Sequence, residues 1–587
     1  MSLYFNPLDV SCKSTIGAIR RKERVTFNVF EYEENVSEEI ALIIWRDGKK
    51  SERYILKKQD SRHTITLKFN AVGLYFYYFS VGNRIFSRGR LRKGSFTESP
   101  TAWQITVHAE KYKVPSWLKG GVMYQIFPDR FNRAENNYPV AKGRKLKQWG
   151  ESPDDPKDGG EFPCHDFFGG NLKGISEKLD YLQSLHVSAI YLNPIFEASS
   201  NHRYDTGDYF KIDSLLGSQE DFDELVRAAQ ERGIRIILDG VFNHTGADSV
   251  YFNRYGNYPS VGAFQSQDSP YYEWYNFHPF PINYDCWWGI ESLPAVNEIN
   301  KCFQEFLLGE NGVVRHWLRR GIGGFRLDVA DELPDEFLKE LRKAVKEENP
   351  EAILYGEVWE DASNKISYDV RREYFQGKEL DSVMNYPLKD AIIDFLRTKN
   401  TEHLRETIAM LMDNYPKQSL DALMNVLGTH DTPRILTVLK QSGFRVPPKE
   451  LLKKAALLQY TMSGIPCVYY GDESGLEGEK DPFCRGCFDW EHIDEDLNTF
   501  YRKLAEIRLS AGKVFAEGIY REIFADRSCL IFERNFRGES VYIYVNCSEN
   551  TYNLTFDGKF IECFTNHVVH DKLTIFPQSY GILRKHS

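Results

Sequence analysis

This sequence lacks the features that mark membrane, secreted and nucleic-acid-binding proteins. No apolar run in its 587 residues reaches the roughly 18 residues that a membrane-spanning helix needs. The first residues have neither the basic region nor the apolar stretch of a secretory signal. The formal net charge of −10 opposes binding to nucleic acid. We therefore expect a cytoplasmic protein with no membrane partner and no nucleic-acid partner.

Cysteine is also sparse, because ten cysteines are spread over the whole chain. Cysteines so far apart do not make a disulfide scaffold, so reduced thiols are expected. The one close pair is Cys484 and Cys487. It lacks the second pair or the histidines of a zinc site, and it lacks the βαβ surroundings of a redox motif. We interpret this spacing as chance or packing.

Both ends of the chain have the patterning of β-sandwiches. The alternation of Val25, Phe27 and Val29 and the aromatic run 74–79 predict strands near the N-terminus. Similar runs return at 530–532, 541–545 and 573–576. We therefore predict an N-terminal β-sandwich over residues 1–118 and a smaller C-terminal β-sandwich over residues 504–587.

Between these ends, short apolar runs alternate with helical patterns, which predicts an α/β fold of the (β/α)8 TIM-barrel type. The predicted strands are Val122–Phe127, Val187–Leu192, Ile234–Asp239, Gly324–Val329, Ile353–Glu357, Ser382–Tyr386, Ala422–Leu427 and Pro466–Tyr470, and the predicted helices include Gly174–Leu185, Asp221–Arg232, Asp335–Glu348 and Lys449–Met462. A long aromatic-rich stretch after the third strand predicts an inserted small domain over residues 243–300. The barrel would then comprise residues 119–242 and 301–503.

Three acidic residues stand at or just beyond the ends of predicted barrel strands. They are Asp328 in Gly-Phe-Arg-Leu-Asp-Val, Glu357 in Gly-Glu-Val-Trp, and Asp431 in Gly-Thr-His-Asp. Active sites of such barrels lie at the carboxyl ends of the strands, so these acids are expected to meet. Hydrolysis of a glycosidic bond needs one carboxylate at the anomeric carbon and one carboxylic acid at the leaving oxygen. The pattern therefore favours chemistry on sugars.

A fourth segment completes an ordered set, since Asp239-Gly-Val-Phe-Asn-His244 ends the third predicted strand. In this order the four segments resemble the motifs of the α-amylase family of glycoside hydrolases. The N-terminal module, the Gly-Glu-Val-Trp segment and the run Asp481-Pro-Phe-Cys-Arg485 are similar to the neopullulanase, cyclomaltodextrinase and maltogenic amylase branch. The resemblance covers nearly the whole chain.

This resemblance implies a role for each of the three acids. Asp328 would be the nucleophile of a retaining mechanism, and Glu357 would be the general acid and then the base. Asp431 would hold sugar hydroxyls and favour a distorted ring. Arg326 shares the barrel-facing side of its strand with Asp328, and we expect this cation to keep Asp328 ionised.

The resemblance also implies a set of substrate-binding residues. His244 and His430 match histidines that donate hydrogen bonds to the sugar at the cleaved bond, and Tyr204 matches an aromatic stacking platform. Trp359 would line the acceptor side, and Asp481 with Arg485 would close the non-reducing end of the cleft. The full substrate-binding set is His202, Tyr204, Asp239, His244, Arg326, Trp359, His430, Asp481 and Arg485.

The largest departure from the family pattern concerns calcium. The family loop usually supplies several carboxylates, whereas the candidate ligands here are Asn132, Asn137, Gly169 and Asn171. Calcium prefers six to eight oxygens with carboxylates among them. Catalysis by a carboxylate pair requires no metal, so no cofactor is expected to be needed, and structural calcium stays an open alternative. A smaller departure is Asp331, which stands where the branch commonly has Asn and would affect the acceptor.

The resemblance implies a retaining hydrolase of α-1,4 bonds in maltooligosaccharides, cyclodextrins and pullulan, with transglycosylation as a further activity. It also implies a homodimer through the N-terminal domain. Three alternatives stay open: an α-1,6-acting relative, an open-cleft α-amylase and a non-catalytic glucan-binding protein. The first two share the three acids, so the products would separate them.

Overall fold

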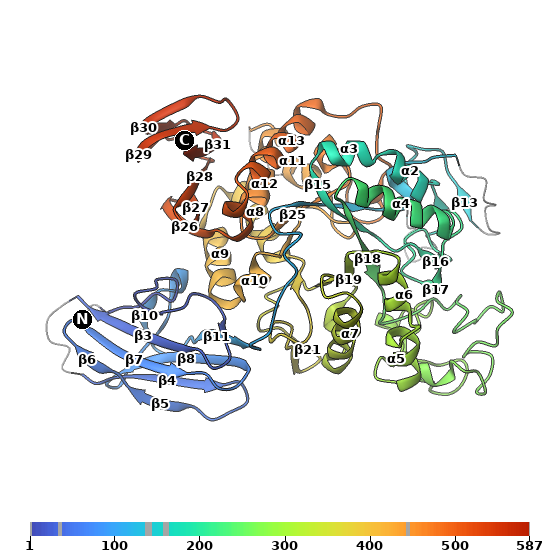
Figure 1. Ribbon diagram of the computed structural model, residues 1–587, viewed down its shortest axis with the longest axis horizontal. Coiled ribbons are helices and arrows are strands. Elements are labelled where there is room, and N and C mark those ends of the chain that lie inside the picture. The colour runs from blue at the N-terminus through green and yellow to red at the C-terminus, as the bar shows by residue number, and fades with distance from the viewer. Residues whose placement is uncertain (1–2, 33–37, 136–143, 156–163, 442–445, 586–587) are drawn as a thin grey trace.

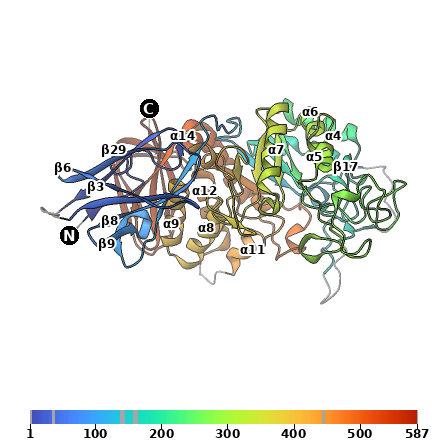
Figure 2. The same ribbon diagram turned by 90° about the horizontal axis from the view of Figure 1, so that it is seen from below.

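The computed structural model describes residues 3–32, 38–135, 144–155, 164–441 and 446–585. A barrel of parallel strands and helices makes up the larger part, and the N-terminal and C-terminal sheets both lie at one end of the elongated molecule (Figure 1, Figure 2). Within the described ranges, no helix combines the length and the apolar character that a membrane crossing requires.

Eight parallel strands of the described chain form the barrel. Their order in the sheet is β23-β20-β19-β18-β15-β12-β25-β24, and a parallel bridge between Met384 and Met424 joins the two outer strands. The strands are β12 (Val122–Ile126), β15 (Val187–Leu192), β18 (Arg235–Gly240), β19 (Gly324–Leu327), β20 (Ile353–Gly356), β23 (Ser382–Val383), β24 (Met424–Asn425) and β25 (Ile465–Tyr469). Each overlaps a predicted run, so the TIM-barrel prediction is confirmed.

The barrel strands are buried on both faces, which is why they appear in the sequence as nearly continuous apolar runs. Alternate residues serve two cores. Met123 and Ile237 belong to the cluster inside the barrel, whereas Tyr124 and Leu238 belong to the cluster between the strands and the helices. Arg326 lies between Phe325 and Leu327 of the outer cluster, so its side chain faces the barrel interior.

Helices cover the outside of the barrel. Their bounds are α1 (Pro128–Phe131), α2 (Leu172–Glu177), α3 (Leu179–Ser184), α4 (Gln219–Glu231), α5 (Lys301–Leu308), α6 (Val313–Arg319), α7 (Asp335–Glu348), α8 (Tyr386–Thr398), α9 (Glu402–Asn414), α10 (Lys417–Leu420), α11 (Ile435–Lys440), α12 (Pro448–Thr461), α13 (Glu495–Ser510) and α14 (Lys513–Glu517). The helix predicted over 174–185 is divided at Lys178 into α2 and α3. Between β20 and β23 the described chain forms the hairpin β21 (Ile366–Ser367) and β22 (Val370–Arg371).

The N-terminal strands form two facing sheets in the described part of the chain. One has the order β1-β3-β7-β6, and the other has the order β10-β9-β8-β11-β2, with β4 paired with β8 and β5 paired with β4. Their bounds are β1 (Leu3–Tyr4), β2 (Ile19–Arg20), β3 (Arg24–Glu31), β4 (Ile40–Arg46), β5 (Glu52–Ile55), β6 (Lys57–Gln59), β7 (Arg62–Lys68), β8 (Gly73–Val81), β9 (Arg84–Arg88), β10 (Gly94–Thr97) and β11 (Trp103–His108). Val25, Phe27 and Val29 pack with Tyr77 and Trp103 in a shared core, as their alternation predicts.

The C-terminal strands form a sheet of order β26-β27-β28-β31-β29-β30. Their bounds are β26 (Ile519–Ala525), β27 (Cys529–Phe536), β28 (Glu539–Asn546), β29 (Tyr552–Glu562), β30 (Val568–Ile575) and β31 (Tyr580–Lys585). The small sheets near the barrel are β13 (Lys145–Leu146) with β14 (Asp166–Phe167), and β16 (Phe196–Ala198) with β17 (Thr206–Ile212). The stretch after β18 is largely irregular and packs around aromatic residues such as Tyr251, Phe252 and Trp274. The domain boundaries themselves stay predictions.

Candidate active site

One guanidinium holds three carboxylates at the carboxyl ends of neighbouring barrel strands. Arg326 Nη1 lies 2.8 Å from Asp239 Oδ1 and 2.8 Å from Asp328 Oδ1, while Nη2 lies 2.9 Å from Glu357 Oε2. Asp239 ends β18, Arg326 is in β19, and Glu357 follows β20. The strand register pairs Asp239 with Arg326, so the sheet itself brings the first two together. All four side chains are buried or nearly so.

The pKa of Asp328 is raised well above its ordinary value, and burial is the main cause. Arg326 opposes this effect, but the nearby carboxylates of Glu357 and Asp239 add to it. Arg326 therefore favours the ionised form of Asp328, as expected, but burial and the neighbouring carboxylates outweigh its effect on the pKa. The physical reason is that three buried carboxylates share one cation.

Glu357 is held by groups on both sides of its carboxylate. The backbone N–H of Val329 donates to Oε2 at 2.9 Å, and the indole N–H of Trp359 donates to Oε1 at 3.1 Å. Val329 has φ 41°, a left-handed conformation that is strained for a β-branched residue. The Trp359 ring stacks on Tyr386 with 4.0 Å between centroids, and 43% of its surface stays exposed. Residues after both Asp328 and Glu357 thus fix the position of Glu357.

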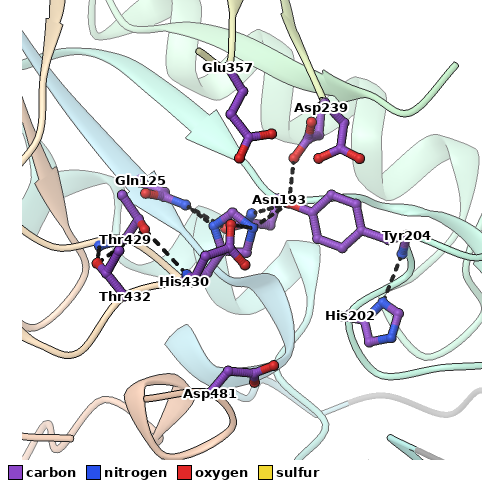
Figure 3. Close-up of polar contacts among 12 residues, drawn as sticks. Gln125, Asn193, His202, Tyr204, Asp239, Glu357, Thr429, His430, Thr432 and Asp481 are labelled. Carbon is purple, nitrogen blue, oxygen red and sulfur yellow. Dashed lines mark hydrogen bonds and ion pairs between the residues drawn. The ribbon is translucent and has the colours of Figure 1, made fainter. Parts of the chain in front are cut away.

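Two tyrosine hydroxyls hold the second oxygen of Asp239. Tyr191 donates to Asp239 Oδ2 at 2.7 Å and Tyr204 donates to it at 2.9 Å. Tyr204 also stacks on His430, with 5.4 Å between centroids and 10° between the ring planes. Burial raises the pKa of Asp239, and Arg326 opposes this rise. Figure 3 shows Tyr204 lying between His202 and His430 below Asp239.

His430 is a neutral imidazole whose tautomer follows from its neighbours. Burial, with Arg485 nearby, lowers its pKa well below the ordinary value. Gln125 donates to Nδ1 at 2.9 Å, so the proton lies on Nε2. That nitrogen is hydrogen-bonded to the Tyr204 hydroxyl and lies 3.0 Å from Asp431 Oδ2. His430 therefore presents a donor toward the acids.

Arg485 joins two acids on the opposite side of the site. Its Nη2 lies 3.3 Å from Asp431 Oδ1 and its Nη1 lies 2.9 Å from Asp481 Oδ1. The Nε–H also donates to the backbone oxygen of His430 at 2.9 Å. Figure 3 shows Asp481 facing the site from the side opposite Glu357. Asp431 is one-third exposed, so its carboxylate remains accessible.

His244 and His202 complete the predicted set. Burial lowers the pKa of each to about 4, so both are neutral near pH 7. The His244 Nδ1 is hydrogen-bonded to Asn243 Oδ1 at 3.1 Å, while its buried Nε2 has no hydrogen-bond partner among the described residues. The His202 Nδ1 accepts from the backbone N–H of Tyr204 at 3.1 Å. A ligand hydroxyl could therefore satisfy the open nitrogen of His244.

These residues line a cavity of about 1920 Å³, which is large enough for several sugar rings. Asp328, Glu357 and Asp431 all reach its wall. Of the predicted substrate-binding residues, His202, Tyr204, His244, Trp359, Asp481 and Arg485 also line it. Arg326, Asp239 and His430 lie behind this wall, where they hold the residues in front of them.

Several residues at the site were not predicted from the sequence. Gln125 and Asn193 hold His430 and Tyr204, and Tyr191 holds Asp239. A polar side chain inside the apolar run 122–127 was the available signal for Gln125. The cavity wall also includes Trp288 and Glu332, which are joined by a hydrogen bond of 2.6 Å from the indole N–H. Aromatic richness of the inserted stretch was the only signal for Trp288.

The candidate calcium loop is held by hydrogen bonds in its described part. Asn171 caps α2, because its Oδ1 accepts from the Gly174 N–H at 2.7 Å, and its amide donates to the Ala134 oxygen at 2.8 Å. The amide of Asn132 donates to the Gly174 oxygen at 3.0 Å. Asn137 lies outside the described residues.

A buried carboxylate close to this loop, that of Asp129, also has its hydrogen-bond partners within the protein. It accepts from the backbone N–H groups of Phe168 and Gly169 and lies 2.7 Å from Arg130 Nε. The oxygen of Asn171 that would bind calcium is already an acceptor. The described residues of this loop therefore fit a hydrogen-bonded connection better than a calcium site.

Comparisons with known proteins give a family match and several named relatives. Residues 125–513 match the family model described as alpha amylase, catalytic domain. An amylopullulanase from Thermoanaerobacter thermohydrosulfuricus is 35% identical, over 91% of this chain and 41% of that protein. A cyclomaltodextrinase from Geobacillus thermopakistaniensis is 35% identical, over 78% of this chain and 75% of that protein.

A solved structure is similar over the whole length. The type III pullulan hydrolase from Thermococcus kodakarensis superposes with a TM-score of 0.72 at 28% identity, covering 100% of both chains. This chain spans less than half the length of the amylopullulanases that it matches.

Proposed function

We propose that this chain, which belongs to the α-amylase family, is a retaining hydrolase of α-1,4-glucosidic bonds in cyclodextrins, pullulan and maltooligosaccharides. One observation carries the proposal: a single guanidinium holds the carboxylates of Asp328 and Glu357 at the wall of a large cavity, with Asp431 on the same wall. Relatives named cyclomaltodextrinase and amylopullulanase support the substrate class.

In the first step, Glu357 gives a proton to the glycosidic oxygen while Asp328 attacks the anomeric carbon. The bond from the anomeric carbon to the leaving oxygen breaks, and a covalent glycosyl ester forms on Asp328. Arg326 positions both carboxylates and limits their mutual repulsion. The N–H groups of Val329 and Trp359 hold Glu357 in place for this transfer.

In the second step, Glu357 takes a proton from water, and that water attacks the anomeric carbon and releases Asp328. A sugar hydroxyl in place of water gives transglycosylation by the same path. Trp359 supplies a partly exposed aromatic face beside Glu357, where a sugar acceptor would stack.

The remaining residues would bind the sugar at the cleaved bond. Asp431 would accept from its hydroxyls, and His430, which lies behind the cavity wall, would hold the Asp431 carboxylate through Nε2. The open nitrogen of His244 provides a further polar contact. Asp481 and Arg485, an ion pair in the loop after β25, would close the non-reducing end of the cavity. Asp481 faces the site from the side opposite Glu357 (Figure 3).

The test is a product profile on β-cyclodextrin, pullulan and soluble starch with purified protein. We expect rapid opening of the cyclodextrin ring, panose from pullulan and slower attack on starch. Proton NMR of the first reducing sugar should show the α-anomer, as retention requires. Fast starch hydrolysis with inert cyclodextrin would replace this proposal with an open-cleft amylase, and no turnover on any substrate would overturn enzymatic function.

A second candidate activity is cleavage of α-1,6 bonds. It is supported by a similar structure, the debranching enzyme from Nostoc punctiforme, which is 30% identical over 81% of this chain. Pullulan separates the two activities, because cleavage of its α-1,6 bonds releases maltotriose whereas cleavage of its α-1,4 bonds releases panose-type trisaccharides. Maltotriose as the main pullulan product would favour this candidate.

We also propose a cytoplasmic homodimer that associates through the N-terminal domain. All ten cysteines are free thiols, which supports a reducing compartment. The N-terminal domain approaches the cavity, because Asp47, in the turn after β4, pairs at 3.0 Å with Arg371 of β22, and β21 contributes Ser367 to the cavity wall. Light scattering on the full chain and on a chain lacking residues 1–118 would test the assembly; a full-length monomer would refute the dimer.

A further inference from the structure

Three acidic side chains outside the cavity converge where the start of α7 meets the segment between β22 and β23. Among the described residues, Asp335, Glu373 and Glu379 bring carboxylate oxygens within 4.8 Å of one another. Asp335 begins α7, and the other two lie in the segment between β22 and β23. Calcium binds oxygens at about 2.3–2.6 Å, so ligands on opposite sides of one ion lie about 5 Å apart. A single ion can therefore reach all three residues.

Glu379 is the member of this cluster that needs a partner. Its side chain is fully buried, and neither carboxylate oxygen has a hydrogen-bond partner among the described residues. The nearest cation is the Lys339 ammonium, which lies 3.6 Å from Oε1 and beyond hydrogen-bond distance. A buried carboxylate without partners is costly, and either a proton or a cation removes that cost.

The cationic side chains around the cluster are engaged with its other two members. Lys339 Nζ lies 2.7 Å from Glu373 Oε2, and Arg372 Nη1 lies 3.1 Å from Asp335 Oδ1. Lys339 is one-third exposed and can turn toward water. An ion between the carboxylates would then replace its ammonium group.

We propose that Asp335, Glu373 and Glu379 form a calcium site that is separate from the catalytic cavity. Oxygen-only donors with three carboxylates suit a hard divalent cation. This site does not depend on the proposed hydrolase activity, and it is distinct from the loop around Asn171.

Such an ion would stabilise the connection that follows β19. The hydroxyl of Tyr374 donates to Asp331 Oδ1 at 2.7 Å, and Arg372 donates to the backbone oxygens of Leu333 and Asp331. Asp331 and Glu332 line the cavity. An ion at the cluster would thus fix the segment that holds this part of the cavity wall.

The experiment measures calcium binding to the full chain after treatment with chelator and dialysis. In a titration with calcium chloride, the wild type is expected to bind one equivalent of calcium. The Glu379→Gln variant should bind it at least about tenfold more weakly. Thermal unfolding should shift upward with calcium in the wild type and by a smaller amount in this variant. The matched control is Glu336→Gln, since Glu336 is exposed on the same helix and should leave both readouts unchanged.

Two further variants keep the test decisive if Glu379→Gln folds poorly. Glu373→Gln removes a partly exposed ligand and should also weaken binding. Lys339→Met removes the competing ammonium and should tighten it. Equal calcium binding by the wild type and both glutamine variants, or no binding by the wild type, would overturn the proposal and leave Glu379 as a protonated carboxyl. Magnesium chloride at the same ionic strength serves as the comparison salt.

Discussion

Replacing Asp328 by asparagine is expected to abolish activity and to stabilise the fold. Asparagine keeps the shape and can still accept from Arg326 at the observed 2.8 Å position, but it carries no charge. In the wild type, one guanidinium serves three carboxylates, from Asp239, Asp328 and Glu357. The variant leaves two carboxylates on the same cation. It therefore removes the proposed nucleophile together with a source of buried repulsion.

The size of each effect follows from this geometry. Loss of the nucleophile is expected to lower kcat by at least about 10⁴-fold, as for other enzymes in which one member of a catalytic set is removed. Relief of buried charge is expected to raise the free energy of unfolding by about 1 kcal/mol at pH 7. The pKa of Asp328 is raised in the folded protein, so ionisation of this group opposes folding at every pH above its ordinary pKa. The stability gain should therefore shrink as the pH falls toward about 4.

The assay pairs initial rates on β-cyclodextrin with calorimetric unfolding at pH 7 and pH 4.5. The matched control is Asp180→Asn, whose carboxylate pairs with Arg232 at the surface and is 81% exposed. Its effects on rate and stability should both be close to zero. A clearly destabilised Asp328→Asn variant would refute the reasoning about shared charge, and near-normal turnover would refute the nucleophile assignment.

Three further predictions test other parts of the site. Glu357→Gln should slow maltooligosaccharides far more than an aryl glycoside with an activated leaving group, because only the former need a proton on the leaving oxygen; equal slowing would refute the general-acid role. Asp481→Asn should raise KM for short maltooligosaccharides several-fold with kcat nearly unchanged, because this carboxylate is 43% exposed and lies opposite Glu357; an equal fall in kcat would contradict this. Because the pKa of His244 is about 4, against an ordinary 6.5, the neutral ring stabilises the fold above pH 6.5. As the pH falls from about 6.5 to 4, His244 should lower the free energy of unfolding by about 3 kcal/mol. A His244→Gln variant should lose that part of the pH dependence.

The predicted fold agrees with the structure where local signals and barrel packing act together. Helix α7 has the predicted bounds, since Pro334 precedes it and acidic residues occupy its first turn. The single helix predicted over 174–185 is two helices, because Lys178 has a non-helical backbone conformation that no glycine or proline at that position marks. The hairpin at 366–371 was not predicted, because its exposed Ile366 and Val370 lack a strand-like alternation long enough to recognise.

The acids of the candidate site could be predicted from the sequence, but the residues around them only in part. An acid at the end of a strand is a local signal, so Asp328 and Glu357 were identified from the sequence alone. Whether a residue in a strand buried on both faces points inward or outward is not a local property, and Tyr191 and Gln125 were missed for this reason.

The shared role of Arg326 depends on the alignment of neighbouring strands. Its place two residues before Asp328 predicts one ion pair, but the register of β18 on β19 puts Asp239 opposite Arg326. The next register, of β19 on β20, places Leu327 opposite Gly356 and so brings Glu357 to the other end of the guanidinium. The strand registers determine how many carboxylates share the Arg326 guanidinium. The sequence pattern showed only one of them and so overstated the effect of Arg326 on the pKa of Asp328. The same division explains why one arginine can position both carboxylates of the proposed catalytic pair.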